Sequence, residues 1–377
     1  MAPFLQPSQA EVERRRLVGV NAETVTDVTS VDFPGHYPGE DHSWDVESFQ
    51  DNFKVQFHKN AKFDSSFSLV GLDASVANAF RRIMIAEIPT VAIEYCFVEN
   101  NTSIIQDEVL SARIGLVPFK GSPEGIRNWL KWWPKPAEDV PKEETFAKCY
   151  DYNTIRLTLQ VECTRNLDAA RGETDPLKAY HNAHVYARDI KFAPFGRQEK
   201  YFSGKNAIAP VYPDILLAKM RPGQCIDIEM HAIKGVGCDH AKFSPVATAS
   251  YRLLPVINIT KPILGKDAVK FARCFPRGVI ELKTVTKEEA NSGRAYEGYE
   301  GEKKAVVADP MKDTVSRECL RHEEFNGKVK LGRVRDHFIF SVESTGQWES
   351  DELFLESVNL LKAKCKKMKD ALNDMSG

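Results

Sequence analysis

A run of apolar residues at helical spacing predicts a helix in the first quarter of the chain. The run lies within residues 73–91, where Asp73 or Ser75 can cap the start through a side-chain oxygen. Pro89 ends the helix because its ring and its missing N–H cannot continue the hydrogen-bond ladder. This face can pack into the protein's own core or against a partner, and the spacing alone allows both. The apolar positions of the helix are Val76, Phe80, Ile83 and Met84.

The polar side of the same helix carries Asn78, Arg81 and Arg82. These residues can form a solvated surface over a core helix, which is a common arrangement. They can also bind a second partner, because guanidinium groups make paired hydrogen bonds to carboxylates or carbonyls. The helix is therefore a candidate for docking on two faces.

A second apolar run predicts a helix at the C-terminus. Its members alternate between steps of four and three residues, and this 3.5-residue repeat makes a narrow seam suited to another helix. The seam consists of Phe354, Val358, Leu361, Cys365, Met368 and Leu372. The remaining surface of the helix is crowded by Lys362, Lys364, Lys366, Lys367 and Lys369. The seam can pack on its own domain or on a partner's helix, and both uses remain open from the spacing.

Alternating apolar and polar residues predict strands before, between and after these helices. The predicted strands lie at residues 53–57, 65–70, 91–97, 114–119, 155–161, 226–230 and 338–342. Loops rich in proline and charge separate the middle ones, so this part is predicted to be a mainly antiparallel β domain. Residues 1–50 are rich in Pro, Gly, Asp and Ser, which predicts an extended N-terminal arm with little regular structure.

Composition narrows the function classes. The chain has 377 residues, enough for two or three domains, and a net charge of -2, which argues against nucleic acid as the principal partner. Its 8 cysteines form no C-x-x-C pair, which favours reduced thiols in an intracellular protein. No apolar run approaches the roughly 18 residues that a membrane span needs, so no membrane contact is expected.

The candidate metal ligands are Cys225, His231, Cys238 and His240. Zinc needs about four converging N or S ligands, but Cys225 and His231 sit too far apart along one strand face to chelate together. We therefore predict no metal and no cofactor. Phosphate-binding glycine loops, nucleophile elbows and distinctively spaced carboxylate pairs are absent from the sequence, so no catalytic residue is predicted.

Three tryptophans, Trp129, Trp132 and Trp133, form a dense aromatic cluster. Such a cluster can cover its own sheet, anchor a protein contact or stack single-stranded bases. Packing within the fold is the first interpretation and a protein interface the second. Base stacking comes last, because the neighbouring sequence is not strongly basic.

Several stretches resemble the alpha-type subunits of cellular RNA polymerases, which carry an Asn-x-x-Arg-Arg helix ending in Ile-Pro. The RIGLVPF stretch at 113–119 and the GCDHAKFSP stretch at 237–245 resemble two further motifs of that family. The chain looks most similar to the larger alpha-like subunit shared by eukaryotic RNA polymerases I and III. The matching positions of the helix are Asn78, Arg81, Arg82, Ile88 and Pro89.

The resemblance implies an α+β fold with a discontinuous dimerisation domain, built from strands and two packed helices. Residues 51–93 and 336–377 would form this domain, and residues 94–254 the antiparallel β insert. Residues 255–335 would be a ferredoxin-like remnant, which holds an iron–sulfur cluster in archaeal relatives. Only Cys274 and Cys319 occur there in this chain, so we expect the remnant to lack the cluster.

The resemblance also implies a function without catalysis. The chain would be an architectural subunit of RNA polymerases I and III, located in the nucleus, including the nucleolus, and serving rRNA, tRNA and 5S rRNA transcription. The apolar positions of the two helices would bind a smaller alpha-like subunit, whereas Asn78, Arg81 and Arg82 would face the second-largest polymerase subunit. Small zinc-binding polymerase subunits would be further partners.

Two other function classes remain open from the residues alone. One is a metal-dependent enzyme that uses the cysteine and histidine positions, which stoichiometric zinc in the purified chain would favour. The other is a stand-alone nucleic-acid-binding protein that uses the tryptophans and the lysine-rich last helix. Salt-sensitive binding of the isolated chain to RNA or DNA would favour that class.

Overall fold

The computed structural model describes residues 8–27, 39–41, 43–134, 148–170, 172–291 and 296–376. The chain divides into two compact units. The first comprises Met1–His58, Phe67–Ala77 and Tyr251–Phe340, and the second comprises Lys59–Ser66, Asn78–Ser250 and Ser341–Gly377. Each unit groups residues that contact one another, which does not test domain boundaries. The boundaries predicted from the family resemblance therefore remain predictions.

The first unit is built on a sheet with the strand order β2-β1-β18-β4-β3, in which β15 also pairs with β18, and β1 is antiparallel to both of its neighbours. Several of these strands continue into the residues of the second unit. The buried rings of Phe67 on β4 and Phe340 on β18 stack on each other, with centroids 5.4 Å apart. The strands are β1 (Leu17–Val20), β2 (Val25–Thr26), β3 (Lys54–Ala61), β4 (Asp64–Val70), β15 (Val246–Ile259) and β18 (Val329–Ser344).

The N-terminal segment belongs to this sheet, so the prediction of an arm with little regular structure is wrong for its described part. Ser8 caps α1 (Gln9–Arg16) by accepting from the backbone N–H of Glu11, and β1 follows directly. Strand β1 pairs with β18 from Leu17 opposite Val334 to Val20 opposite Leu331. A short α2 (Val46–Asn52) precedes β3. Residues 1–7, 28–38 and 42 of the predicted arm lie outside the described residues.

The remainder of the first unit packs around a separate apolar cluster. Helix α8 (Gly265–Arg273) covers the hairpin of β16 (Ile280–Thr284) and β17 (Lys303–Val307), with Phe271 fully buried between them. Phe325 meets Phe271 edge to face at 5.2 Å. Shorter elements complete this part: α9 (Lys287–Asn291), η5 (Pro310–Lys312), η6 (Glu318–Arg321) and η7 (Glu323–Phe325).

The second unit contains a four-stranded sheet with the order β11-β7-β14-β5, antiparallel throughout. Its inward residues alternate with partly exposed ones along β14, as the sequence pattern predicts, and they form the main core of the unit. The predicted strands at 91–97, 155–161 and 226–230 are therefore confirmed. The strands are β5 (Thr90–Asn101), β7 (Thr154–Glu162), β11 (Lys191–Phe192) and β14 (Cys225–Gly235).

The predicted strand at 114–119 is wrong, because α4 (Asp107–Gly115) occupies its first part. Asp107 and Glu108 lie in the first turn, where negative charge favours a helix, and Leu110 and Ile114 bury one face of it. Only β6 (Phe119–Lys120) is extended. The other small elements are β8 (Thr164–Arg165), α6 (Pro176–Ala179), β9 (Tyr180–His181), β10 (His184–Tyr186), η2 (Ala187–Asp189), α7 (Gln198–Tyr201), η3 (Gly204–Asn206), β12 (Ala209–Pro210), β13 (Leu216–Lys219) and η4 (Ala241–Phe243).

Candidate functional site

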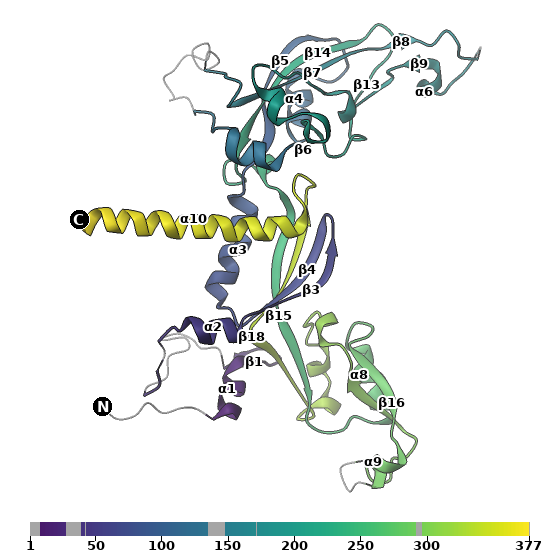
Figure 1. The fold of residues 1–377 in the computed structure, drawn as a ribbon. Coiled ribbons are helices and arrows are strands. Elements are labelled where there is room, and N and C mark those ends of the chain that lie inside the picture. Colours follow the sequence, from purple (N-terminus) through teal and green to yellow (C-terminus); the bar gives the residue numbers. More distant parts are fainter. Residues whose placement is uncertain are drawn as a thin grey trace. The chain divides into compact units, whose positions relative to one another are not determined.

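The two predicted helices are present as α3 (Ala74–Ala86) and α10 (Ser350–Ser376). The carboxylate of Asp73 accepts hydrogen bonds from the hydroxyl of Ser75 and from its backbone N–H, the latter at 2.7 Å. These two hydrogen bonds hold the pKa of the Asp73 carboxyl below its usual value. Helix α3 ends before Pro89, where the backbone N–H of Cys238 donates to the carbonyl of Ala86 at 2.9 Å. Figure 1 shows α10 crossing α3 and continuing past it to the C-terminus.

The apolar face of α3 is largely enclosed by the chain itself. Phe80 is 8% exposed and Met84 0%, Ile83 is buried, and Val76 is half-buried. The ring of Phe80 meets that of Phe354 on α10 edge to face, with centroids 5.3 Å apart. Of the residues predicted on α3 for a partner, Phe80 therefore contacts α10 of the same chain, and Ile83 and Met84 are buried within the fold.

Helix α10 changes character along its 27 residues. Its first two turns are buried at Leu353, Phe354 and Ser357. From Val358 onward the apolar seam turns to solvent, and Met368 is 68% exposed. We call the seam beyond the buried turns the α10 stripe, and it comprises Val358, Leu361, Cys365, Met368, Leu372 and Met375.

Met375 is 85% exposed and continues the stripe one step beyond the predicted seam. Its position three residues after Leu372 extends the same repeat, so the signal was present in the sequence. Leu361 is half-buried and Cys365 is exposed. An exposed apolar row of this length is typical of a surface that binds another protein.

An ion pair ties the first turns of α10 to the rest of the second unit. The carboxylate of Glu356, only 5% exposed, lies 2.7 Å from a guanidinium nitrogen of Arg127. The same guanidinium sits 5.2 Å from the ring centroid of Trp348, which precedes α10. Because both partners come from distant parts of the sequence without local patterning, sequence reasoning missed this contact.

The backbone that carries Arg127 is itself held in place. Arg127 lies in η1 (Gly125–Trp129), a π-helical turn in which the N–H of Leu130 donates to the carbonyl of Gly125 at 2.9 Å. A Cβ at Gly125 would meet the Phe202 ring at 2.8 Å, so the turn requires glycine there. The ammonium of Lys234 donates to the carbonyls of Arg127 at 3.0 Å and Leu130 at 3.2 Å.

Lys234 is a buried cation, which makes the site sensitive to pH. Burial lowers the pKa of its ammonium to about 8, and the nearby charges of Lys131 and Arg127 act in the same direction. Its ammonium also lies 5.1 Å from the ring centroid of Trp132. The neutral form is therefore accessible at mildly alkaline pH.

On the polar side of α3, the side chain of Arg81 is hydrogen-bonded to a neighbour and that of Arg82 is exposed. Arg81 donates to the side-chain oxygen of Asn78 from two nitrogens, at 3.0 and 2.8 Å. Arg82 is exposed and makes no hydrogen bond or ion pair with the residues that the structure describes. The three predicted docking residues thus lie together on one side of the helix.

The four candidate metal ligands do not form a site. His231 packs edge to face against Phe97, and Nδ1 of His240 accepts from the backbone N–H of Lys242. Cys238 is exposed and Cys225 is half-buried on β14. Within the described ranges, no three His, Cys, Asp or Glu side chains are grouped so that they could hold a metal ion.

The tryptophan cluster is divided between packing and exposure. Trp129 stacks on Tyr201 at 4.5 Å, and Trp133 meets Tyr95 edge to face at 5.3 Å. Trp132 is exposed apart from its contact with the ammonium of Lys234. Packing within the fold therefore accounts for two of the three rings.

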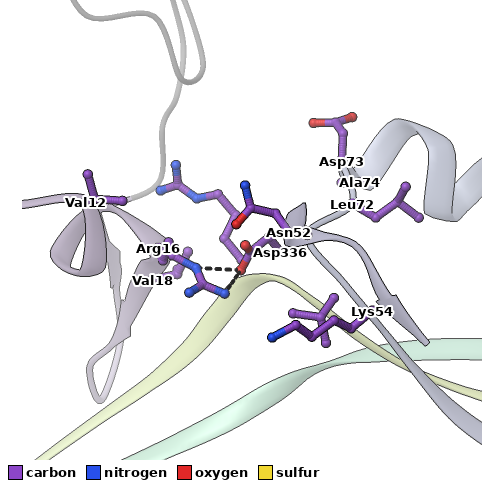
Figure 2. Close-up of a pocket in the computed structure, with 12 residues that line it drawn as sticks. Val12, Arg16, Val18, Asn52, Lys54, Leu72, Asp73, Ala74 and Asp336 are labelled. Carbon is purple, nitrogen blue, oxygen red and sulfur yellow. Dashed lines mark hydrogen bonds and ion pairs between the residues drawn. The ribbon is translucent and has the colours of Figure 1, made fainter. Parts of the chain in front are cut away.

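A pocket in the first unit lies where the end of α1, the end of α2 and the start of α3 meet β18 (Figure 2). Arg16 and Asp336 form an ion pair of 2.9 Å at its wall, as Figure 2 shows. The rest of the lining mixes apolar side chains such as Val12 and Leu72 with the polar side chains of Asn52, Lys54, Asp73 and Arg335. No helix in the described residues is long and apolar enough to cross a membrane.

Comparisons with known proteins agree on one family. The model of the RNA polymerase Rpb3/Rpb11 dimerisation domain matches residues 66–365. The RNA polymerases I and III subunit RPAC1 of Saccharomyces cerevisiae is 50% identical over 354 residues, covering 94% of this chain and 98% of that protein. The human protein of the same name is 44% identical over 366 residues, covering 97% of this chain and 98% of that protein. The RNA polymerase II subunit rpb3 of Dictyostelium discoideum is 28% identical over 306 residues, covering 79% of this chain and 87% of that protein.

Replacing Phe80 by Asp is expected to destabilise the chain on its own. The substitution removes a buried ring and places a carboxylate against Phe354, so the free energy of unfolding should fall by at least about 3 kcal/mol. Urea unfolding of the purified chain measures this, with Val358→Asp, on the exposed part of α10, as the control. An unchanged urea midpoint for Phe80→Asp would mean that Phe80 is not part of the core.

Replacing Lys234 by Met tests the buried cation. The folded state lowers the pKa of Lys234 from 10.5 to about 8, so the unfolded chain binds more protons between these values. Stability therefore rises with pH in this window, and the cost of the buried charge is fully present below it. From about pH 8 to about pH 9.5, the wild type should gain about 1.5 kcal/mol relative to Lys234→Met. Parallel pH dependences of the two proteins would refute the lowered pKa.

Proposed function

This chain belongs to the RNA polymerase Rpb3/Rpb11 dimerisation-domain family, and we propose that it is a non-catalytic architectural subunit shared by RNA polymerases I and III. The relatives that carry this name are covered almost end to end, which supports the assignment. The resemblance seen in the helix from Asn78 to Pro89 thus led to the right family. The chain would work in the nucleus, and in the nucleolus where it serves polymerase I.

The α10 stripe is the observation that carries the proposed pairing with a smaller alpha-like subunit. Its exposed apolar side chains stand on a helix whose first turns are already seated on α3. The surface is therefore pre-organised, and binding does not require the helix to fold first. Val358, Leu361, Cys365, Met368 and Leu372 would contact the partner directly. Phe80, Ile83, Met84 and Phe354 would act mainly by holding α10 in position, and Val76 lies half-buried beside them.

The arginine side of α3 supports docking of the second-largest polymerase subunit. Asn78 orients the guanidinium of Arg81, and Arg82 extends to solvent beside it. Two neighbouring guanidinium groups, one of them already oriented, suit carboxylates or carbonyl groups of a partner. In this arrangement the pair of alpha-like subunits forms a platform, to which small zinc-binding subunits would also attach.

The remaining parts of the proposed architecture are the β insert and the ferredoxin-like remnant. The antiparallel sheet of β5, β7, β11 and β14 fits the insert. In the remnant, burial raises the pKa of the Cys319 thiol to about 12, with Cys274 nearby adding to the effect. An iron–sulfur cluster needs several thiolates, so this pair of protonated, buried cysteines does not fit one.

Replacing Met368 by Asp should prevent pairing without affecting the chain's own fold. Met368 is exposed, so the carboxylate disturbs no core, but it would be buried against the partner at a high cost. Co-expression with the smaller alpha-like subunit, followed by affinity capture, should recover less than about one tenth of the wild-type partner. Ala363→Asp places the same charge on the opposite side of α10 and should pair normally. Normal pairing of Met368→Asp would refute the proposed interface.

Replacing Arg82 by Glu tests the second docking face. The exposed guanidinium makes no hydrogen bond or ion pair among the described residues, so the pair with the smaller subunit should form normally. Attachment of the second-largest subunit to that pair should fall by about tenfold or more, because attraction becomes repulsion. Copurification of tagged chain with both subunits measures the two steps separately. Loss of the pair itself would show that the two faces of α3 are wrongly assigned.

A further inference from the structure

The residues that flank the α10 stripe carry one sign of charge. With the stripe in the contact positions of the 3.5-residue repeat, Lys362 and Lys369 line one flank. Lys364 lines the other flank, where its ammonium pairs with the carboxylate of Glu87. Lys362 and Lys369 are both exposed, and no ion pair involves them among the described residues. The flank beside the stripe is therefore a row of lysines.

We propose that the α10 stripe binds a helix of another chain, and that the apolar seam of this helix is flanked by Asp or Glu opposite Lys362 and Lys369. This proposal rests on the proposed function. Residues flanking a helix seam form ion pairs across the contact and set partner choice. The stripe supplies buried apolar area, which is not selective by itself. The lysine flank then determines which helix is accepted.

The same flank disfavours a second copy of this chain. In an antiparallel pair of α10 helices, Lys362 and Lys369 would face the same lysines of the copy. In a parallel pair, Lys369 would face Lys364 of the copy, because opposite flanks then meet. Like charges face each other in the antiparallel pair, and in the parallel pair Lys369 meets a Lys364 that Glu87 already partners. Neither direction supplies Lys362 and Lys369 with a free carboxylate, so the charge pattern favours a different chain as partner.

The double substitution Lys362→Glu, Lys369→Glu tests the flank. The matched control, Lys366→Glu with Lys367→Glu, makes the same change of net charge on the side of α10 away from the stripe. Both variants should remain helical by circular dichroism, because Lys and Glu have similar helix propensity. Binding of each full-length chain to the purified smaller alpha-like subunit is then measured at about 0.1 M and about 1 M KCl, where the screening length falls from about 10 Å to about 3 Å.

At low salt, the flank variant should bind the smaller subunit about tenfold more weakly than wild type, and the control should stay within about twofold. At high salt the difference should disappear, because the stripe is intact. Equal weakening of both variants, or none in either, would overturn the proposal. So would a wild-type chain that forms a homodimer at low salt in light scattering. A wild-type chain that never binds the smaller subunit would instead refute the proposed function.

Discussion

The position of α10 depends on an ion pair between the half-exposed side chain of Arg127 and the buried carboxylate of Glu356. An almost fully buried carboxylate costs several kcal/mol without a counter-charge, so Glu356 holds the helix where Arg127 can reach it. The carbonyl of Arg127 is tied in turn to Lys234 on β14. The first turns of α10 are thus fixed to the sheet of the second unit, and the later turns can extend into solvent in a defined direction.

The sequence predicted both helices and the central strands because their signals are local. Periods of 3.5 and 2 residues are visible within ten or twenty residues, and the burial along β14 follows its alternation closely. The N-terminal strand β1 escaped prediction because it is short and depends on pairing with β18 at the far end of the chain. The ion pair between Arg127 and Glu356 was not predicted for the same reason, because a single arginine and a single glutamate far apart in the sequence form no pattern.

Two alternatives were left open for each helix, packing within the fold or binding a partner. On α3 the apolar face is enclosed, so the first alternative applies to Phe80, Ile83 and Met84. On α10 both alternatives apply in turn, because Phe354 is buried and Met368 is exposed on one continuous seam. Periodicity could not separate them, since the same repeat runs through both parts of the helix.

The charged residues beside the seam mark where α10 leaves the fold. Residues 350–357 contain no lysine and include the buried Leu353, Glu356 and Ser357, whereas five lysines occur between Lys362 and Lys369. A lysine ammonium is costly to bury, so a dense lysine flank requires that the seam beside it stay near solvent in the free chain. A partner can then cover the seam without burying unpaired charge only if it supplies carboxylates at the rim. The flank therefore carries information that the apolar spacing lacks, both on the extent of the core and on the chemistry of the partner.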